Sequence, residues 1–287
     1  MYIMNFRDDV IMNYLRSELK KAVTNKYFII SCISALILVA IHAASQTILY
    51  IDYISNIREY QEQINFAAPI NTAFTWWIGG SEKNLYASIF FSISPLLASL
   101  AYSWSYCHDM KNSYVISTDK KLEYYISKYM ATFISSGLTI AMSLLLNFLL
   151  ILLFVPVLKP DSVYDIYYGI FSNSFLGSAF YTNPFLYIAI FILLNFIFYG
   201  LIGCSSLTIS IYTKHRIVSV LIPFVMLFAI QYTKSLYTDK IMAEISPMTF
   251  LFPAKSAYAS WNVIIIEILV LFLITFLGSI AKGLKHD

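Results

Sequence analysis

The stretch from Pro184 to Tyr212 reads PFLYIAIFILLNFIFYGLIGCSSLTISIY, and it contains no Asp, Glu, Lys or Arg. An α-helix needs about 20 consecutive apolar residues to cross the hydrocarbon core of a bilayer, so this stretch is long enough to cross one. The composition of the whole chain agrees. Of its 287 residues, 59% are hydrophobic and only 12% are charged, whereas about 25% are charged in an average soluble domain.

Six stretches of this kind predict an all-α integral membrane protein with six transmembrane helices in a single domain, residues 1–287. The fifth has the shortest apolar core and contains Pro223. The first follows Asp8 and Asp9 and exceeds the ~7–15 apolar residues of a signal peptide, so we expect it to stay in the membrane. The predicted spans lie at about 27–50, 86–107, 129–155, 184–212, 217–232 and 261–281.

Lysine and arginine are distributed unequally between the two sides that these spans define. Of the 19 in the chain, thirteen fall on the side of both termini. Cytoplasmic segments of membrane proteins are enriched in Lys and Arg, so we expect a multi-pass protein of the plasma membrane with both termini in the cytoplasm. The six on the other side are Arg58, Lys83, Lys159, Lys234, Lys240 and Lys255.

An amphipathic helix is predicted before the first span, at about 5–26. Its apolar residues recur every four positions, and its basic residues fall elsewhere on the helix. Such a helix beside a span is expected to lie along the membrane interface. It is either a surface anchor or a lever that contacts a cytoplasmic partner. The apolar positions are Ile11, Leu15, Leu19 and Val23.

Two of the predicted outer loops carry specific signals. Trp76 and Trp77 in the first loop are typical of the aromatic belt at the boundary between water and lipid, as is Trp261 at the start of the sixth span. The third loop, Thr233–Ser260, is too apolar for a solvated connector. We therefore expect it to form a re-entrant outer hairpin of short broken helices enclosed by protein.

The sequence contains no common catalytic or nucleotide-binding motif. It has no GxxxxGK[ST] phosphate loop, no HExxH and no GxSxG. Its cysteines, Cys32, Cys107 and Cys204, have no metal-ligand spacing and are interpreted as small packing residues. We therefore expect no catalytic residue, cofactor-binding residue or metal ligand in this chain.

Glu267 is the only acidic residue placed deep in a predicted span. His42 and Asn147 lie at a similar depth in the first and third spans. A buried carboxylate is costly in a bilayer, so these three residues could form an intramembrane polar cluster that lines a cavity. Alternatively, Glu267 is protonated, reaches the interface, or hydrogen-bonds a neighbouring helix.

The longest predicted cytoplasmic connector reads SYCHDMKNSYVISTDKKLEYYISKYM, from Ser105 to Met130. Asp109 can cap a short helix, and Ser117, Thr118 and Asp119 form a second helix start. The residues after Asp119 lead directly into the third span. This pattern predicts a short helix on the membrane surface, followed by a break and a new helix that re-enters the bilayer.

The amphipathic N-terminal helix, the six spans, the Asp109–Lys128 connector and the Pro-containing segment between spans five and six together resemble the membrane subunit of a type-2 ABC transporter. The resemblance implies that the short helix is a coupling helix, which docks on a separate ATPase subunit. No glycine follows Asp109, a departure from the commoner pattern that weakens the alignment of this helix. The contact residues would be Asp109, Met110, Lys111, Asn112, Ser113 and Tyr114.

The resemblance also implies partners and a function. The assembly would contain two ATPase subunits, which bind ATP and Mg²⁺, and a second permease that is either a copy of this chain or a paralogue. The substrate is expected to be amphipathic: a peptide antibiotic, a lipid-like molecule or a drug. Two alternatives are a carrier driven by an ion gradient, which would need Glu267 and His42, and a non-transporting membrane scaffold or immunity protein. No nucleic acid partner is expected.

Overall fold

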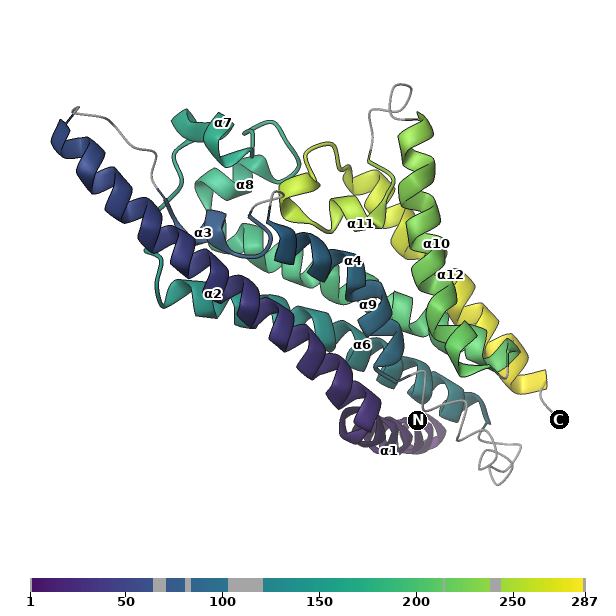
Figure 1. Cartoon of the computed structure of the whole chain (residues 1–287). Coiled ribbons are helices and arrows are strands. Elements are labelled where there is room, and N and C mark those ends of the chain that lie inside the picture. The colour runs from purple at the N-terminus through teal and green to yellow at the C-terminus, as the bar shows by residue number, and fades with distance from the viewer. Residues whose placement is uncertain are drawn as a thin grey trace.

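The computed structural model describes residues 2–63, 71–80, 84–102, 121–213, 215–237 and 244–285. Every regular element within these ranges is a helix, which confirms the predicted all-α class. The long helices run side by side in one bundle, and short helices gather at one end of it (Figure 1).

Among the described residues, five helices are long and apolar enough to cross a membrane, which supports a multi-pass membrane protein. A further apolar helix, α4 (Leu85–Leu100), has 16 residues and lies within the predicted second span, of which residues 103–107 are outside the described residues. The helix α9 has the predicted bounds, and it starts where Asn183 caps Leu186 N–H and Pro184 takes the first helical position. The five helices are α2 (Lys26–Gln63), α6 (Lys121–Leu152), α9 (Pro184–Tyr212), α10 (Arg216–Tyr237) and α12 (Trp261–Lys285).

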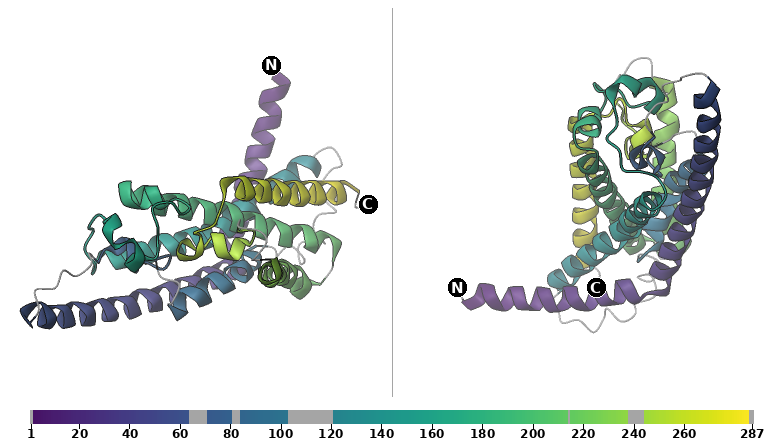
Figure 2. Two further views of the ribbon diagram at one scale, coloured as in Figure 1. Left: turned by 90° about the horizontal axis from the view of Figure 1, so that it is seen from above. Right: turned by 90° about the vertical axis from the view of Figure 1, so that its left-hand side faces the viewer.

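The N-terminal helix α1 (Tyr2–Thr24) lies crosswise at one end of the bundle, and the C-terminal end of α12 lies at that same end (Figures 1 and 2). We call this end the α1 end and the opposite end the loop end. The predicted amphipathic helix is therefore present, but its buried face differs from the prediction. Ala22 is fully buried, whereas Val23 is 45% exposed. Because an α-helix has 3.6 residues per turn, residues spaced four apart do not stay on one face, and Val23 has turned away from the face that Ala22 occupies.

The helix α2 is longer than the predicted first span. It has 38 residues, or ~57 Å at 1.5 Å per residue, and it continues past Tyr50 to Gln63. No Gly or Pro interrupts residues 51–63, and isoleucines recur at Ile51 and Ile54. The segment that we predicted to begin the first outer loop is thus helical.

The helices α6 and α9 form the centre of the bundle, where α6 also contacts α1, α2, α4 and α12. Glycines allow the close approach of α6 and α9. A Cβ atom added at Gly137 would lie 2.5 Å from the Phe196 carbonyl oxygen, and one added at Gly203 would lie 2.0 Å from Ser136 Oγ. Both distances are shorter than any van der Waals contact.

Short helices fill the loop end of the bundle. They pack through aromatic side chains, among them the stacked rings of Phe91 and Phe252, whose centroids are 4.3 Å apart. The prediction for Trp77 was wrong, because this residue is buried against Phe148 and does not face lipid. The short elements are α3 (Ala73–Trp76), η3 (Ser162–Tyr164), α7 (Asp165–Tyr168), α8 (Gly177–Thr182), α11 (Pro247–Phe250) and η4 (Pro253–Lys255).

We expect Gly137→Leu to separate α6 from α9 and to destabilise the protein by about 1–3 kcal/mol or more, because the added side chain meets backbone atoms. Ala189→Leu is the matched control, since Ala189 is exposed on α9. Thermal unfolding of the two variants in detergent would test this. Equal melting temperatures would contradict the close helix packing described here.

Candidate functional site

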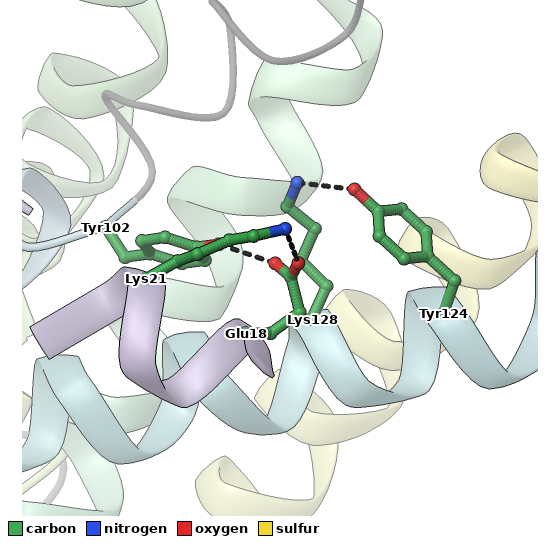
Figure 3. Close-up of polar contacts among 5 residues, drawn as sticks. All are labelled: Glu18, Lys21, Tyr102, Tyr124 and Lys128. Atoms are coloured by element: carbon green, nitrogen blue, oxygen red, sulfur yellow. Dashed lines mark hydrogen bonds and ion pairs between the residues drawn. The ribbon is translucent and has the colours of Figure 1, made fainter. Parts of the chain in front are cut away.

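A group of buried polar side chains joins three helices at the α1 end (Figure 3). Tyr102, just after α4, donates its hydroxyl proton to Glu18 Oε2 of α1 over 2.6 Å. On α6, Lys128 Nζ donates to the Tyr124 hydroxyl over 3.0 Å. The Lys21 ammonium forms an ion pair with Glu18 Oε1 at 2.6 Å. We call Glu18, Tyr102, Tyr124 and Lys128 the polar joint.

The polar joint is enclosed although it contains two charged residues. Glu18 and Lys128 are each 2% exposed. The Lys128 ammonium also lies 5.2 Å from the centre of the Tyr124 ring and 6.0 Å from that of the Tyr102 ring, distances at which a cation is attracted to an aromatic face. Charges are rarely buried unless they are paired, so these contacts hold α1 in a defined place on α4 and α6.

Electrostatic interactions keep Glu18 ionised in this joint. Burial alone would raise the pKa of its carboxyl group. The positive charge of Lys128 and hydrogen bonds from Lys21 and Tyr102 act in the opposite direction and prevail, so the pKa lies below the ordinary value of 4.5. A carboxyl group with a lowered pKa stabilises the folded state above its ordinary pKa, and this contribution is lost as the pH falls.

The polar joint was not among the predicted site residues, although the sequence carries a signal for it. Glu18 lies three residues after Leu15 and four before Ala22, so an acid occupies the buried face of an amphipathic helix. Lys128 follows Tyr124 by one helical turn in the same way. The sequence signals were therefore an acid, Glu18, on an apolar helix face and a base, Lys128, near the start of a span.

A row of polar residues runs along α6 from the polar joint to the loop end, and all of them are buried. The hydroxyl groups mostly donate to carbonyl oxygens of the preceding helical turn, as Ser143 Oγ does to Thr139 O over 2.8 Å. Such bonds satisfy a hydroxyl within its own helix. The row consists of Lys128, Thr132, Ser135, Ser136, Thr139, Ser143 and Asn147.

Two members of the predicted intramembrane cluster meet at the far end of this row. Asn147 Nδ2 lies 3.0 Å from His42 Nδ1 and also donates to the Val39 carbonyl oxygen over 2.9 Å. Asn147 Oδ1 accepts a hydrogen bond of 2.8 Å from the backbone N–H of Ile78. Asn147 therefore joins α2, α6 and the residue that follows Trp77.

Glu267 lies elsewhere, on α12, where Glu244 is the charged residue near enough to interact with it. Glu244 is buried, and its carboxylate accepts a hydrogen bond from Ser246 N–H over 3.0 Å. The structure thus pairs His42 with Asn147 and places Glu267 beside a second acid.

Within the predicted re-entrant hairpin, residues 244–260 form the two short helices α11 and η4. Phe250, Leu251 and Phe252 are buried, and Asn195 Nδ2 of α9 donates to the Leu251 carbonyl oxygen over 3.0 Å. Non-helical backbone that is enclosed in this way has its polar groups satisfied by protein.

The predicted coupling-helix residues, Asp109 to Tyr114, lie outside the described residues. The structure does describe both flanks of their segment. Tyr102 precedes it and Lys128 follows it, and both belong to the polar joint. The joint therefore connects the two flanks of this segment to α1.

We expect Glu18→Ala to loosen α1, because it leaves the Lys128 ammonium buried without its acidic neighbour. Removing one partner of a buried pair typically costs about 3–5 kcal/mol. Backbone hydrogen exchange over residues 12–24 should become faster, whereas exchange in α9 should not change. Ser17→Ala is the matched control, since Ser17 is the exposed neighbour of Glu18 on α1. Equal effects of the two substitutions would contradict the importance of the buried contact.

A pH titration provides a separate test. In the native protein, the protection of α1 amides should fall as the pH is lowered below 4.5, because protonation removes the negative charge of Glu18. The Glu18→Gln variant should have weaker protection at neutral pH and should lose this part of the pH dependence. An identical pH profile in both proteins would show that Glu18 does not hold α1.

Comparisons with models of known protein families, with curated proteins and with solved structures gave no significant match to this chain.

Proposed function

We propose that the chain is the permease subunit of an ATP-binding cassette exporter of the type-2 class. It would move an amphipathic molecule, such as a peptide antibiotic, a lipid-like molecule or a drug, across the plasma membrane. Separate ATPase subunits would supply the energy, because the sequence contains no phosphate loop. In this proposal the α1 end faces the cytoplasm and the loop end faces outward.

The polar joint is the observation that carries the proposal. A permease without a nucleotide site must receive its driving force mechanically, through a cytoplasmic segment that the ATPase binds. Tyr102 and Lys128 flank the segment that contains Asp109–Tyr114, and both meet α1 in the joint. Buried charged groups separate only at a high free-energy cost, so a displacement of this segment would move α1 and α6 together.

The position of α1 supports the same proposal. It lies crosswise to the bundle (Figure 2), so it would lie along the membrane surface if the bundle spans the bilayer. Arg16 and Lys20 are exposed on it, where they could contact anionic lipid or the acidic surface of a partner. A second permease copy or paralogue would complete the assembly.

The arrangement at the loop end suits an exporter that has no large outer domain. The residues between the short helices α11 and η4 are buried and contact α4 and α9, as expected for backbone that dips into the membrane. The carrier alternative would need Glu267 and His42 to be essential, and the two residues have different neighbours. His42 pairs with Asn147, and the electrostatic neighbour of Glu267 is Glu244.

Purification of the tagged chain from its own host in mild detergent would test the proposal. We expect mass spectrometry to find a co-purifying subunit that contains a phosphate loop. The amount of this subunit should fall at least tenfold with Asp109→Ala plus Lys111→Ala, because each tenfold loss of affinity needs only about 1.4 kcal/mol.

The matched control is Lys159→Ala plus Asp161→Ala, which also removes one base and one acid but at the loop end. This variant should retain the ATPase subunit. A native chain that purifies alone in repeated trials would contradict the permease function and favour the carrier or the scaffold.

A further inference from the structure

Residues 71–80, which include α3, are buried at the loop end although they form no long helix. Ala73, Phe74, Trp77 and Ile78 are each at most 1% exposed. The only regular element in the segment is the four-residue helix α3. A short segment of this kind owes its place to tertiary contacts, because a single helical turn has almost no stability of its own.

The segment is held by few backbone contacts to the rest of the protein. Ala73 N–H donates to the Pro156 carbonyl oxygen over 3.0 Å, and the Gly79 carbonyl oxygen accepts from Ala254 N–H over 2.9 Å. These two bonds connect it to other segments of the loop end. The third bond, from Ile78 N–H to Asn147 Oδ1, is the one that connects it to a long helix of the bundle.

Asn147 is well suited to hold this segment. Its amide nitrogen donates to Val39 O and His42 Nδ1, which orients the side-chain oxygen toward Ile78. All of these groups are buried. If Asn147 were removed, the Ile78 N–H would be left buried without an acceptor, which is more costly than the gain from the bond itself.

Two buried donors beside this contact have no hydrogen-bond partner among the described residues: His42 Nε2 and Trp77 Nε1. His42 Nδ1 accepts from Asn147, so the proton of the neutral ring is on Nε2. Unsatisfied buried donors raise the free energy of the closed arrangement. Opening of the segment would admit water to them, so the closed and open arrangements differ less in free energy than in a fully satisfied core.

We propose that residues 71–80 form the outer gate of the permease and that the hydrogen bond from Ile78 to Asn147 holds this gate closed. The proposal rests on the transport function above, because a gate needs a passage. The transported molecule would leave on the loop-end side when the Ile78–Asn147 bond breaks and the segment swings away from α6. Contact with Ala254 would carry η4 along with it.

Cysteine labelling in intact cells tests the gate, and its interpretation does not depend on an ATPase partner. The native cysteines are replaced, and a reporter is introduced as Ala73→Cys in the gate or as Ala35→Cys in the N-terminal third of α2. Both alanines are 0% exposed. A membrane-impermeant maleimide is then added from outside. We expect Asn147→Ala to accelerate labelling of the gate reporter about tenfold or more, because a buried bond worth about 1.4 kcal/mol or more is lost.

Ser143→Ala is the matched control, since Ser143 is buried one turn earlier on α6 and bonds only to its own helix. It should leave the labelling rate unchanged. Gly79→Ala is a second way to open the gate and keeps the proposal testable if Asn147→Ala does not reach the membrane. The added Cβ would lie 2.4 Å from the Trp77 ring and 2.7 Å from Pro253, so this variant should also accelerate labelling.

Equal labelling rates in the Asn147→Ala and Ser143→Ala variants would overturn the proposal, as would a parallel increase at the Ala35→Cys reporter, which would indicate general loosening. The result is independent of the purification experiment. Faster labelling of the gate reporter alone, in a chain that purifies without an ATPase, would retain the gate and reject the ABC permease.

Discussion

Polar groups enclosed in an apolar helix bundle must find their partners inside the protein, and the structure depends on this constraint. Along α6 most of the hydroxyl groups meet it within their own helix, as Ser143 does with the Thr139 carbonyl oxygen. The residues at the two ends of the row also need partners from outside α6. Lys128 needs the joint that Glu18 and the tyrosines provide, and Asn147 needs groups from α2 and from the residues after α3. The polar residues at the two ends of α6 thereby determine which segments pack against those ends.

This arrangement makes α6 the element that both ends of the molecule share. It is one continuous helix from Lys121 to Leu152, and glycines bring α9 directly against it. In the proposed permease, α6 would move as one element, because it is close-packed against α9. A movement that begins at the polar joint would therefore reach Asn147.

The sequence was sufficient to predict the long helices, because a span is defined by continuous apolar composition and local end signals. The bounds of α9 and the start of α12 at Trp261 were predicted correctly. The extension of α2 was missed, since residues 51–63 mix isoleucine with polar residues, and hydropathy does not show where a helix ends in water. A Gly or Pro would mark such an end, and residues 51–63 contain neither.

The candidate site was predicted only in part, and the reason is that its contacts join residues far apart in the sequence. His42 and Asn147 were recognised as polar residues at similar depth, and they do meet. Glu267 satisfied the same criterion but lies on α12, where it interacts with Glu244. Trp77 shows the same limit: an aromatic residue next to a span suits the lipid boundary and the protein core equally well, and tertiary packing decides between them.

In the proposed permease, ATP bound by the partner ATPase at the α1 end would change the structure at the loop end. The most direct test is to reconstitute the chain with its co-purified ATPase in lipid nanodiscs and to label Ala73→Cys with and without trapped ATP. We expect trapping to change the labelling rate of this buried residue, while that of Ala35→Cys stays constant. An active complex in which ATP trapping leaves both rates unchanged would contradict it.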